Sequence, residues 1–359
     1  MTAASMFPTT TTMPPIRRAP AIQIQVVDSV EGLMGLEAEW GSLLRASLCA
    51  TVFQTFEWQS AWLRAFGRHD PAIRPLVLAV REHGWLIGLA PLMVRNTGGL
   101  RTLTFLGAPY ADYHGFLVDP AAAETALAAI WRFIAGTRGV WDAIDLDDIR
   151  PDSALLSYLR GPAFRTLLPD ARIEPSSRCF LLDLHNSAKV QQILQKREYQ
   201  VKLRRLGRQG KLELLHHSDP ARVAERMPLY IEQHRAQWRD RPDGFARFDD
   251  PHVTPLFTAT AQALSSRGWL LLSELTLDGR PVAFFYSFVF RGAYLVYRPC
   301  FDVQIGRYSP GSVLLYLLIE HLAARPFHTF DLMRGEHPYK LEYTTSTPHN
   351  GRLMLGSAL

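Results

Sequence analysis

The sequence has few cysteines, few charged residues and no long hydrophobic run. Its three cysteines, Cys49, Cys179 and Cys300, lie far apart in the chain. They lack the spacing of a metal site or a redox pair, and they predict ordinary buried thiols in a reducing cytoplasm. Charged residues make up 20% of the chain, which excludes a disordered acidic protein. The apolar runs stop far short of the about 20 residues that a bilayer span requires, so no transmembrane segment is predicted.

What the sequence does contain is enough apolar material for two cores. With 359 residues, of which 47% are hydrophobic, the chain exceeds the usual size of one domain. Residues 1–20 are rich in Thr and Pro and show no apolar stretch followed by a cleavage site. We therefore expect a disordered tail and no secretion signal. These features predict a cytoplasmic protein, and a peripheral position at the inner face of the membrane stays open.

Basic residues are concentrated in one segment. Between residues 196 and 211 the single acidic residue is Glu198. On a helix starting near Ser187, the arginines would lie roughly opposite an apolar stripe that includes Tyr199. Such a face is either simply solvated or binds an anion, such as a phosphate, a tRNA or an acidic polymer. Arg204 is the candidate substrate contact on this face. The basic residues of the segment are Lys196, Arg197, Lys202, Arg204, Arg205, Arg208 and Lys211.

One order of elements occurs twice along the chain: helices, a hairpin, a strand, a loop, a long helix and a further strand. The hairpins begin at Leu76 and Trp269. The strands that follow the long helices begin at Ala143 and Thr329, at nearly the same offset. A duplicated mixed α/β domain explains this order. The predicted units are the tail over residues 1–20, a first domain over 21–185 and a second domain over 186–359.

Local signals support these elements. Thr55 has the chemistry of a helix cap, and Trp58 and Trp62 follow it at helical spacing. The two tryptophans predict core packing rather than a stacking platform. Hairpin turns are expected at residues 82–84 and 278–280, which both contain glycine.

The loop before the second long helix has the chemistry of an anion site. Ser309 is placed to cap the helix, Pro310 suits its first position, and Gly311 lets a ligand approach the backbone. Free N–H groups at a helix start, with a neighbouring cation, favour a pyrophosphate or a carboxylate. Plain helix capping explains the same residues, and the loop alone leaves both interpretations open. The candidate donor contacts are Arg307, Tyr308, Ser309, Gly311 and Ser312.

Several motifs together resemble a known family. They are similar to elements of the bacterial CelD-type acetyltransferases of the GNAT superfamily. The resemblance implies two tandem GNAT-like domains, acetyl-CoA or another acyl-CoA as cosubstrate, no metal, and a role in cellulose or other exopolysaccharide synthesis. One departure from the usual GNAT loop is Pro310, which stands where a glycine is common. The motifs, spread over residues 22–345, are QTFEWQSAWLRAFG, LIGLAPLMV, KLRRLGRQGKLEL, YSPGSVLLYLLIE and FDLMRGEHPYK.

Two alternatives accompany this interpretation. The Fem peptidyltransferases are distant relatives of the family and take their acyl group from aminoacyl-tRNA. They usually carry a long helical arm, for which this sequence has no segment of sufficient length, but the basic segment keeps a tRNA donor open. The other alternative is a non-catalytic binding module of a polysaccharide synthesis complex.

The stretch FDLMRGEHPYK begins like a buried strand and ends in charges. Strand alternation places Phe330 and Leu332 on one face and Asp331 on the other, where a carboxylate can face a cleft. A partly buried carboxylate there can act as a base or hold the acceptor amine. An ion pair with Arg334 is the competing interpretation. The candidate catalytic residues are Asp331, Arg334, Glu336 as the second candidate base, and Tyr339 and Lys340 as donors to the acyl oxygen or an anionic acceptor.

Further residues are candidates for acceptor binding. Tyr297, Arg298 and Asp302 come from the end of the strand that precedes the donor loop. In the first domain, Tyr113 and His114 lie in the equivalent loop, but the helix behind them lacks a glycine-rich start. We therefore expect the first domain to have lost donor binding and to line part of the acceptor cleft. A polar surface loop is the alternative.

Other chemistries are not indicated. The sequence has no His-Glu-x-x-His, no Gly-x-Ser-x-Gly and no phosphate-binding loop ending in Gly-Lys-Ser/Thr. His234 lies on an apolar helix face and is interpreted as a core histidine. The predicted reaction is N-acetylation of an amino sugar or a polysaccharide precursor, with hydroxyl acylation left open.

Overall fold

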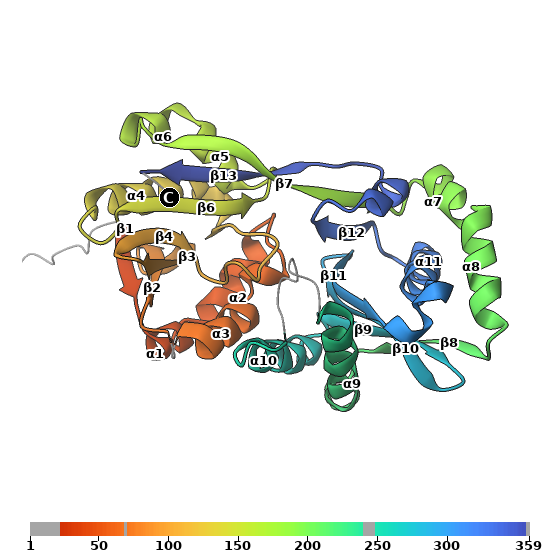
Figure 1. Ribbon diagram of the computed structural model, residues 1–359. Coiled ribbons are helices and arrows are strands. Elements are labelled where there is room, and N and C mark those ends of the chain that lie inside the picture. Colours follow the sequence, from red (N-terminus) through yellow and green to blue (C-terminus); the bar gives the residue numbers. More distant parts are fainter. Residues whose placement is uncertain (1–21, 68–69, 240–247, 357–359) are drawn as a thin grey trace, which may run out of the picture.

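The computed structural model describes residues 22–67, 70–239 and 248–356 (Figure 1). Its core is one continuous 13-stranded mixed sheet, with strands ordered β1-β2-β3-β4-β6-β13-β7-β12-β11-β10-β9-β8 and β5 paired to β3. The predicted mixed α/β class with two GNAT-like halves is confirmed. The predicted disordered tail over residues 1–20 lies outside the described residues.

The first half contains the elements that the sequence pattern predicts. Its helices are α1 (Val30–Met34), α2 (Glu37–Ala46), α3 (Phe56–Trp62) and α4 (Ala123–Gly136). Its strands are β1 (Ile22–Val27), β2 (Ile73–Glu82), β3 (Trp85–Thr97), β4 (Leu100–Phe105), β5 (Leu117–Val118) and β6 (Ala143–Ile149). Two further helices, α5 (Ala154–Arg160) and α6 (Pro162–Leu167), lead into the long strand β7 (Arg172–Asp183).

The second half repeats the order. Its helices are α7 (Ser187–Leu194), α8 (Arg197–Gly207), α9 (Pro220–Trp238), α10 (Val253–Ser266) and α11 (Pro310–Ala323). Its strands are β8 (Leu212–His217), β9 (Leu270–Leu277), β10 (Arg280–Phe290), β11 (Ala293–Phe301), β12 (Thr329–Arg334) and β13 (His349–Leu355). The short helices η4 (Val303–Tyr308) and η5 (Pro338–Tyr343) flank α11 and β12.

Local chemistry explains several boundaries. The Thr55 side chain accepts a hydrogen bond from the Trp58 backbone N–H at 3.2 Å, so the predicted cap of α3 is confirmed. Both predicted hairpin turns are also confirmed, because β2–β3 and β9–β10 pair antiparallel around them. Each turn needs two residues with positive φ, and His83 with Gly84 and Asp278 with Gly279 supply them.

Strand pairing joins the two halves. The C-terminal strand β13 runs antiparallel to both β6 and β7, and β7 also pairs antiparallel with β12. The last described strand, β13, therefore lies in the sheet beside β6 of the first half, as Figure 1 shows. Sequence patterns did not predict β13. The domain division after residue 185 stays a prediction, and strands on both sides of it share one sheet.

The basic segment differs from the prediction. Instead of one helix from Ser187, it forms the two helices α7 and α8, separated at Gln195 and Lys196. The apolar stripe is confirmed, since Tyr199 and Leu206 are buried. Several of its charges already have partners, including Lys196, which lies 2.7 Å from a carboxylate oxygen of Glu342. Both helices pack against α11.

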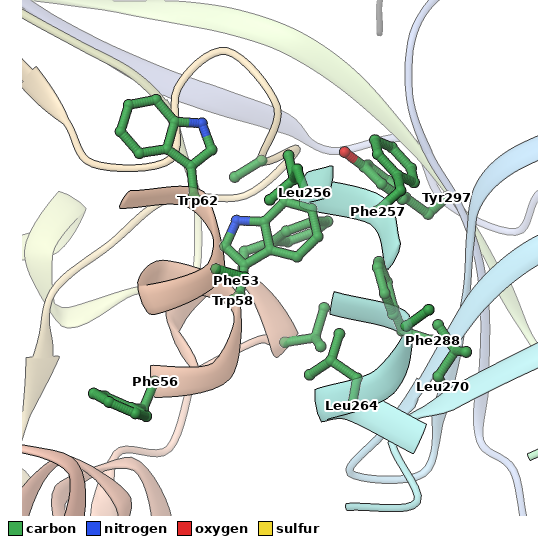
Figure 2. Close-up of a cluster of buried hydrophobic side chains, with 14 of the residues drawn as sticks. Phe53, Phe56, Trp58, Trp62, Leu256, Phe257, Leu264, Leu270, Phe288 and Tyr297 are labelled. Carbon is green, nitrogen blue, oxygen red and sulfur yellow. The ribbon is translucent and has the colours of Figure 1, made fainter. Parts of the chain in front are cut away.

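Aromatic side chains fill the contact between the halves (Figure 2). Trp58 of α3 packs edge-on against Phe288 of β10 and Tyr297 of β11, with ring centroids 5.9 and 5.6 Å apart. Trp58 and Trp62 are fully buried, which confirms their prediction as core residues. This shared core fixes the first half against β10 and β11, where the candidate site begins.

Candidate active site

The site lies where two parallel strands separate. β11 and β12 pair from Ala293 with Thr329 to Leu295 with Asp331, and no pair is recorded beyond that point among the described residues. A cavity of about 430 Å³, here called the central cavity, opens between the strand ends. Its walls include Tyr297 and Arg298 of β11, Met333 and Arg334 of β12, Asp112, His234, Tyr339 and Lys340.

A second cavity connects this space to the start of α11. This helix-end cavity, of about 250 Å³, is lined by Gly311 and Ser312. It shares Trp238, Pro299, His337 and Tyr339 with the central cavity. The two spaces therefore adjoin, and a ligand can extend from the helix start toward the separated strands.

The surroundings of the first residues of α11 explain why position 311 is a glycine. A Cβ on Gly311 would lie 3.2 Å from a ring carbon of Phe301, so a larger side chain would crowd the end of β11. Pro310 occupies the first helical position as predicted, but Ser309 does not cap with its side chain. It instead adopts a left-handed conformation with φ of 55°, which turns the chain into the helix. The backbone N–H groups at this helix start have no intrahelical partner and favour an anion.

The other predicted donor contacts point elsewhere. Among the described residues, Arg307, Tyr308 and Ser309 are not part of the helix-end cavity wall. The guanidinium of exposed Arg307 lies 4.8 Å from the ring centroid of Tyr308. The Tyr308 hydroxyl donates to Gln209, at the end of α8, at 3.0 Å. Only Gly311 and Ser312 of the predicted set thus line this cavity.

Asp331 is held by hydrogen bonds to both carboxylate oxygens. Its Oδ2 accepts from the Tyr113 hydroxyl at 2.8 Å, and its Oδ1 accepts from the Met333 N–H at 2.7 Å. Burial raises the pKa of Asp331 to about 6, although the Tyr113 and Met333 bonds oppose the rise. The alternation of the strand is confirmed, because Phe330 and Leu332 belong to one core cluster and Met333 to another.

Asp331 lines a third cavity. This strand-start cavity, of about 510 Å³, lies near the beginnings of β11 and β12 and is also lined by Tyr113, Arg150 and Asn350. Asp331 was expected to face a cleft, and it lines this strand-start cavity, while Met333, two positions on, lines the central cavity. The pairing of β12 with β7 shifts its register between Asp331 and Arg334, and Met333 has a φ of 62°.

Arg334 connects β12 to the first half. Its Nε donates to Asp112 at 2.9 Å, its Nη1 donates to Asp148, and its Nη2 donates to the Pro109 carbonyl at 2.8 Å. Asp148 is 1% exposed. The guanidinium therefore neutralises two carboxylates of the first half at the edge of the central cavity.

The residues after β12 form one wall of the central cavity. Lys340 is 5% exposed, and its Nζ donates to the Arg334 carbonyl at 2.7 Å and the Met333 carbonyl at 3.4 Å. Burial lowers its pKa to about 8. Tyr339 lines both adjoining cavities, whereas Glu336 is exposed. The structure thus brings Lys340 and Tyr339 together at the strand gap.

The predicted acceptor contacts separate into two groups. Tyr297 and Arg298 line the central cavity, and Tyr113 reaches Asp331 from the first half. Asp302 instead caps η4 and pairs with Arg280 at 2.6 Å. Arg204 lies on exposed α8, where its Nε donates to the Gln200 carbonyl at 3.0 Å.

The first half closes the equivalent strand gap with its own chain. β4 and β6 pair in parallel at Thr102 with Ala143 and Leu103 with Ile144. Beyond these pairs His114 forms a parallel bridge with Ile149. The His114 ring stacks on Phe105 at 4.8 Å, and burial lowers its pKa to about 3. The loop residue predicted as an acceptor contact is thus buried inside the first half.

Asp112 and His234 line the wall of the central cavity, and neither was among the candidate site residues named from the sequence. Asp112 holds Arg334, a contact across 222 residues that no local pattern signals. His234 is 3% exposed and packs beside Phe248, so its place in the core is confirmed. It also lines the central cavity. Its position on the cavity side of α9 depends on how α9 packs on β11, which helical spacing alone does not specify.

The described residues contain no group of three or more His, Cys, Asp or Glu side chains placed to hold a metal ion. None of the helices in the described part of the chain is long and apolar enough to cross a membrane.

Comparisons with known proteins agree with this architecture. Residues 195–341 match the acetyltransferase (GNAT) domain family. No curated protein matches the chain with significant sequence similarity. Similar solved structures include FemX, with a TM-score of 0.59, 12% identity and coverage of 88% of this chain and 95% of that one.

Two other solved structures are also similar. The C-terminal domain of a protein described as a lysylphosphatidylglycerol synthetase from Agrobacterium fabrum has a TM-score of 0.58 and 14% identity, covering 91% of this chain and 93% of that one. L-PGS from Bacillus licheniformis has a TM-score of 0.56 and 10% identity, with coverage of 89% and 91%. At these identities the likeness concerns the fold alone. The match over residues 195–341 is more specific, and it covers β11, α11 and β12, so this part of the chain is similar to GNAT acetyltransferase domains.

Proposed function

We propose that this protein is an acyl-CoA-dependent acyltransferase that acetylates the amine of an amino sugar or polysaccharide precursor in exopolysaccharide or cell-envelope synthesis. The observation that carries the proposal is the gap between β11 and β12, which opens into the central cavity and adjoins the start of α11. The amino sugar and the exopolysaccharide role come from the CelD-type resemblance.

The helix-end cavity is the proposed place of the donor diphosphate. The diphosphate of an acyl-CoA is an anion that the free N–H groups of Gly311 and Ser312 can bind. The adjoining cavities leave room for the acyl end to reach the separated strands. The first half offers no such place, because His114 bridges to Ile149 in the equivalent gap. A single donor site, in the second half, is therefore proposed.

The chemistry needs a proton acceptor and an oxyanion partner. Attack of the amine on the acyl carbon forms the new C–N bond, expels the CoA thiolate and releases a proton. Asp331, with its pKa raised to about 6, is ionised at neutral pH and is the proposed acceptor of that proton, from its position in the neighbouring strand-start cavity. Lys340 donates to two backbone carbonyls, which leaves one of its three N–H bonds for the developing oxyanion.

A binding and turnover assay tests the proposal. At about 100 times its dissociation constant, acetyl-CoA should stabilise the protein by roughly 2.7 kcal/mol. Adding an amino sugar should then cause the release of free CoA thiol from acetyl-CoA at a measurable rate. Absence of stabilisation by any acyl-CoA, together with tRNA that copurifies with the protein, would overturn the proposal in favour of an aminoacyl-tRNA donor bound along α8. Mass spectrometry of precursor pools from cells with and without the protein identifies the acceptor.

A further inference from the structure

Arg298 is a partly buried cation that has no carboxylate within ion-pair distance among the described residues. Its guanidinium lies 4.6 Å from the Tyr297 ring centroid, on the wall of the central cavity. Its Nε is buried and makes no hydrogen bond to the described residues. None of the ion pairs found among these residues includes Arg298. Because a buried guanidinium N–H without an acceptor is costly, this arrangement points to an anionic ligand.

A second polar atom from a different element faces the same cavity. His234 of α9 is 3% exposed, lines the central cavity, and has a buried Nδ1 with no partner among the described residues. Burial, reinforced by the charge of Arg298, lowers the pKa of His234 to about 3, so the ring is neutral. The Nδ1 of a neutral imidazole and the Nε of a guanidinium, both without a hydrogen-bond partner among the described residues, can together bind one ligand group.

The other cations of the central cavity are already engaged. Arg334 pairs with Asp112 and Asp148. Lys340 donates to the backbone carbonyls of Met333 and Arg334. Arg298 is therefore the cation of this wall that is best placed to bind a charge on a ligand.

The donor diphosphate is not the anion in question. Its proposed place, at Gly311 and Ser312, is in the helix-end cavity, whose wall does not include Arg298 or His234. Arg298 shares the wall of the central cavity with Asp112, which belongs to the first half. The anion site therefore lies in a cavity that both halves line.

We propose that Arg298, with His234, binds an anionic group of the acceptor, a carboxylate or a phosphate carried near the amine that is acylated. This inference rests on the proposed function and narrows its substrate class to anionic amines. Neutral amino sugars then bind weakly, because they leave the Arg298 guanidinium unpaired. A central cavity of about 430 Å³ is within the size range of sites for small ligands.

Matched acceptors test the inference. Acetyl-CoA is the donor in each assay, and three amino sugars serve as acceptor probes. Glucosamine carries no anionic group, glucosamine 6-phosphate carries a phosphate, and muramic acid carries a carboxylate. At least one anionic probe should have a kcat/KM about 10- to 100-fold above that of glucosamine, as one charged hydrogen-bonded contact implies. The preferred probe identifies the anion as phosphate or carboxylate.

Variants assign that preference to Arg298. Arg298→Gln should remove the preference by raising the acceptor KM, with an unchanged acetyl-CoA dissociation constant, and Arg298→Lys should retain part of it. Arg132→Gln, at an exposed position of α4, is the matched control and should retain the full preference. Equal rates with neutral and anionic probes, or a loss of acetyl-CoA affinity in Arg298→Gln, would overturn the inference while leaving the acyltransferase proposal intact.

A binding measurement separates the two proposals. Inorganic phosphate should raise the melting temperature of the acetyl-CoA complex, in which the helix-end cavity is filled, and this rise should be lost in Arg298→Gln. If no amine is acetylated, phosphate binding to the free protein that depends on Arg298 but not on Gly311 still supports the anion site. Phosphate stabilisation that is the same in Arg298→Gln and in the unaltered protein contradicts it.

Discussion

The hydroxyl of Tyr113 donates a 2.8 Å hydrogen bond to Oδ2 of Asp331, across 218 residues of sequence. Tyr113 belongs to the first half and is 3% exposed. Tyr113 therefore lowers the pKa of Asp331, the proposed base in the second half. Its own half is the one that we propose has no donor site. In the proposed mechanism, the first half therefore contributes to the reaction through Tyr113.

Replacing Tyr113 tests this influence. The hydrogen bond lowers the pKa of Asp331, so in Tyr113→Phe the carboxyl should titrate above its present value of about 6. The acid limb of the kcat profile should move to higher pH by about one pH unit or more, as expected for loss of a charged hydrogen bond. Tyr158→Phe, at a partly exposed position of α5, is the control. An unmoved acid limb would show that Asp331 is not the group that titrates.

Removing the carboxylate itself is the sharper change. Asp331→Asn keeps the shape of the side chain but cannot accept the amine proton, so kcat should fall by about 10² to 10⁴. The acetyl-CoA dissociation constant, measured by calorimetry, should stay the same because Asp331 does not line the helix-end cavity. Exposed Asp170→Asn should keep full activity. Normal turnover in Asp331→Asn would remove this residue from the mechanism.

Sequence patterns predicted local structure better than the site. The caps, hairpins and alternation of Phe330 with Asp331 follow from periods of two to four residues and from turn chemistry. The partners of Arg334 do not, because Asp112 and Asp148 reach it only once the sheet has formed. The hydrophobic periodicity of a strand indicates which of its faces is buried. It does not indicate which side chains from distant parts of the sequence pack against that face.

The same limit explains other differences. The C-terminal strand β13 completes the sheet between β6 and β7, and its short alternating pattern carries no information about those partners. Ser309 was expected to cap α11 because serine is a frequent cap, but its backbone is left-handed and its side chain makes no cap hydrogen bond. Local propensity indicated the correct residue and the wrong interaction.

The glycine at the start of α11 offers a test of donor binding. In Gly311→Val the side chain would crowd Phe301, because even a Cβ would lie 3.2 Å from its ring. The shifted helix start should weaken acetyl-CoA binding by about tenfold or more, and Gly311→Ala should have a smaller effect. Gly136→Ala, where an added Cβ meets nothing within 4 Å, is the control. Unchanged affinity in a folded Gly311→Val protein would place the diphosphate elsewhere.

Arg334 holds the two halves together through buried charge. In Arg334→Met, Asp112 and Asp148 lose their shared partner, and Asp148 is 1% exposed. An uncompensated buried carboxylate costs about 3–5 kcal/mol, which urea unfolding should detect as a lower midpoint with the same slope. Adding Asp148→Asn should recover part of this loss, since it removes one of the stranded charges. Arg280→Met breaks the pair with Asp302, in which Arg280 is 65% exposed, and should cost less than about 1 kcal/mol. An equal cost for the two single replacements would mean that Arg334 stabilises the protein by packing rather than by its charge.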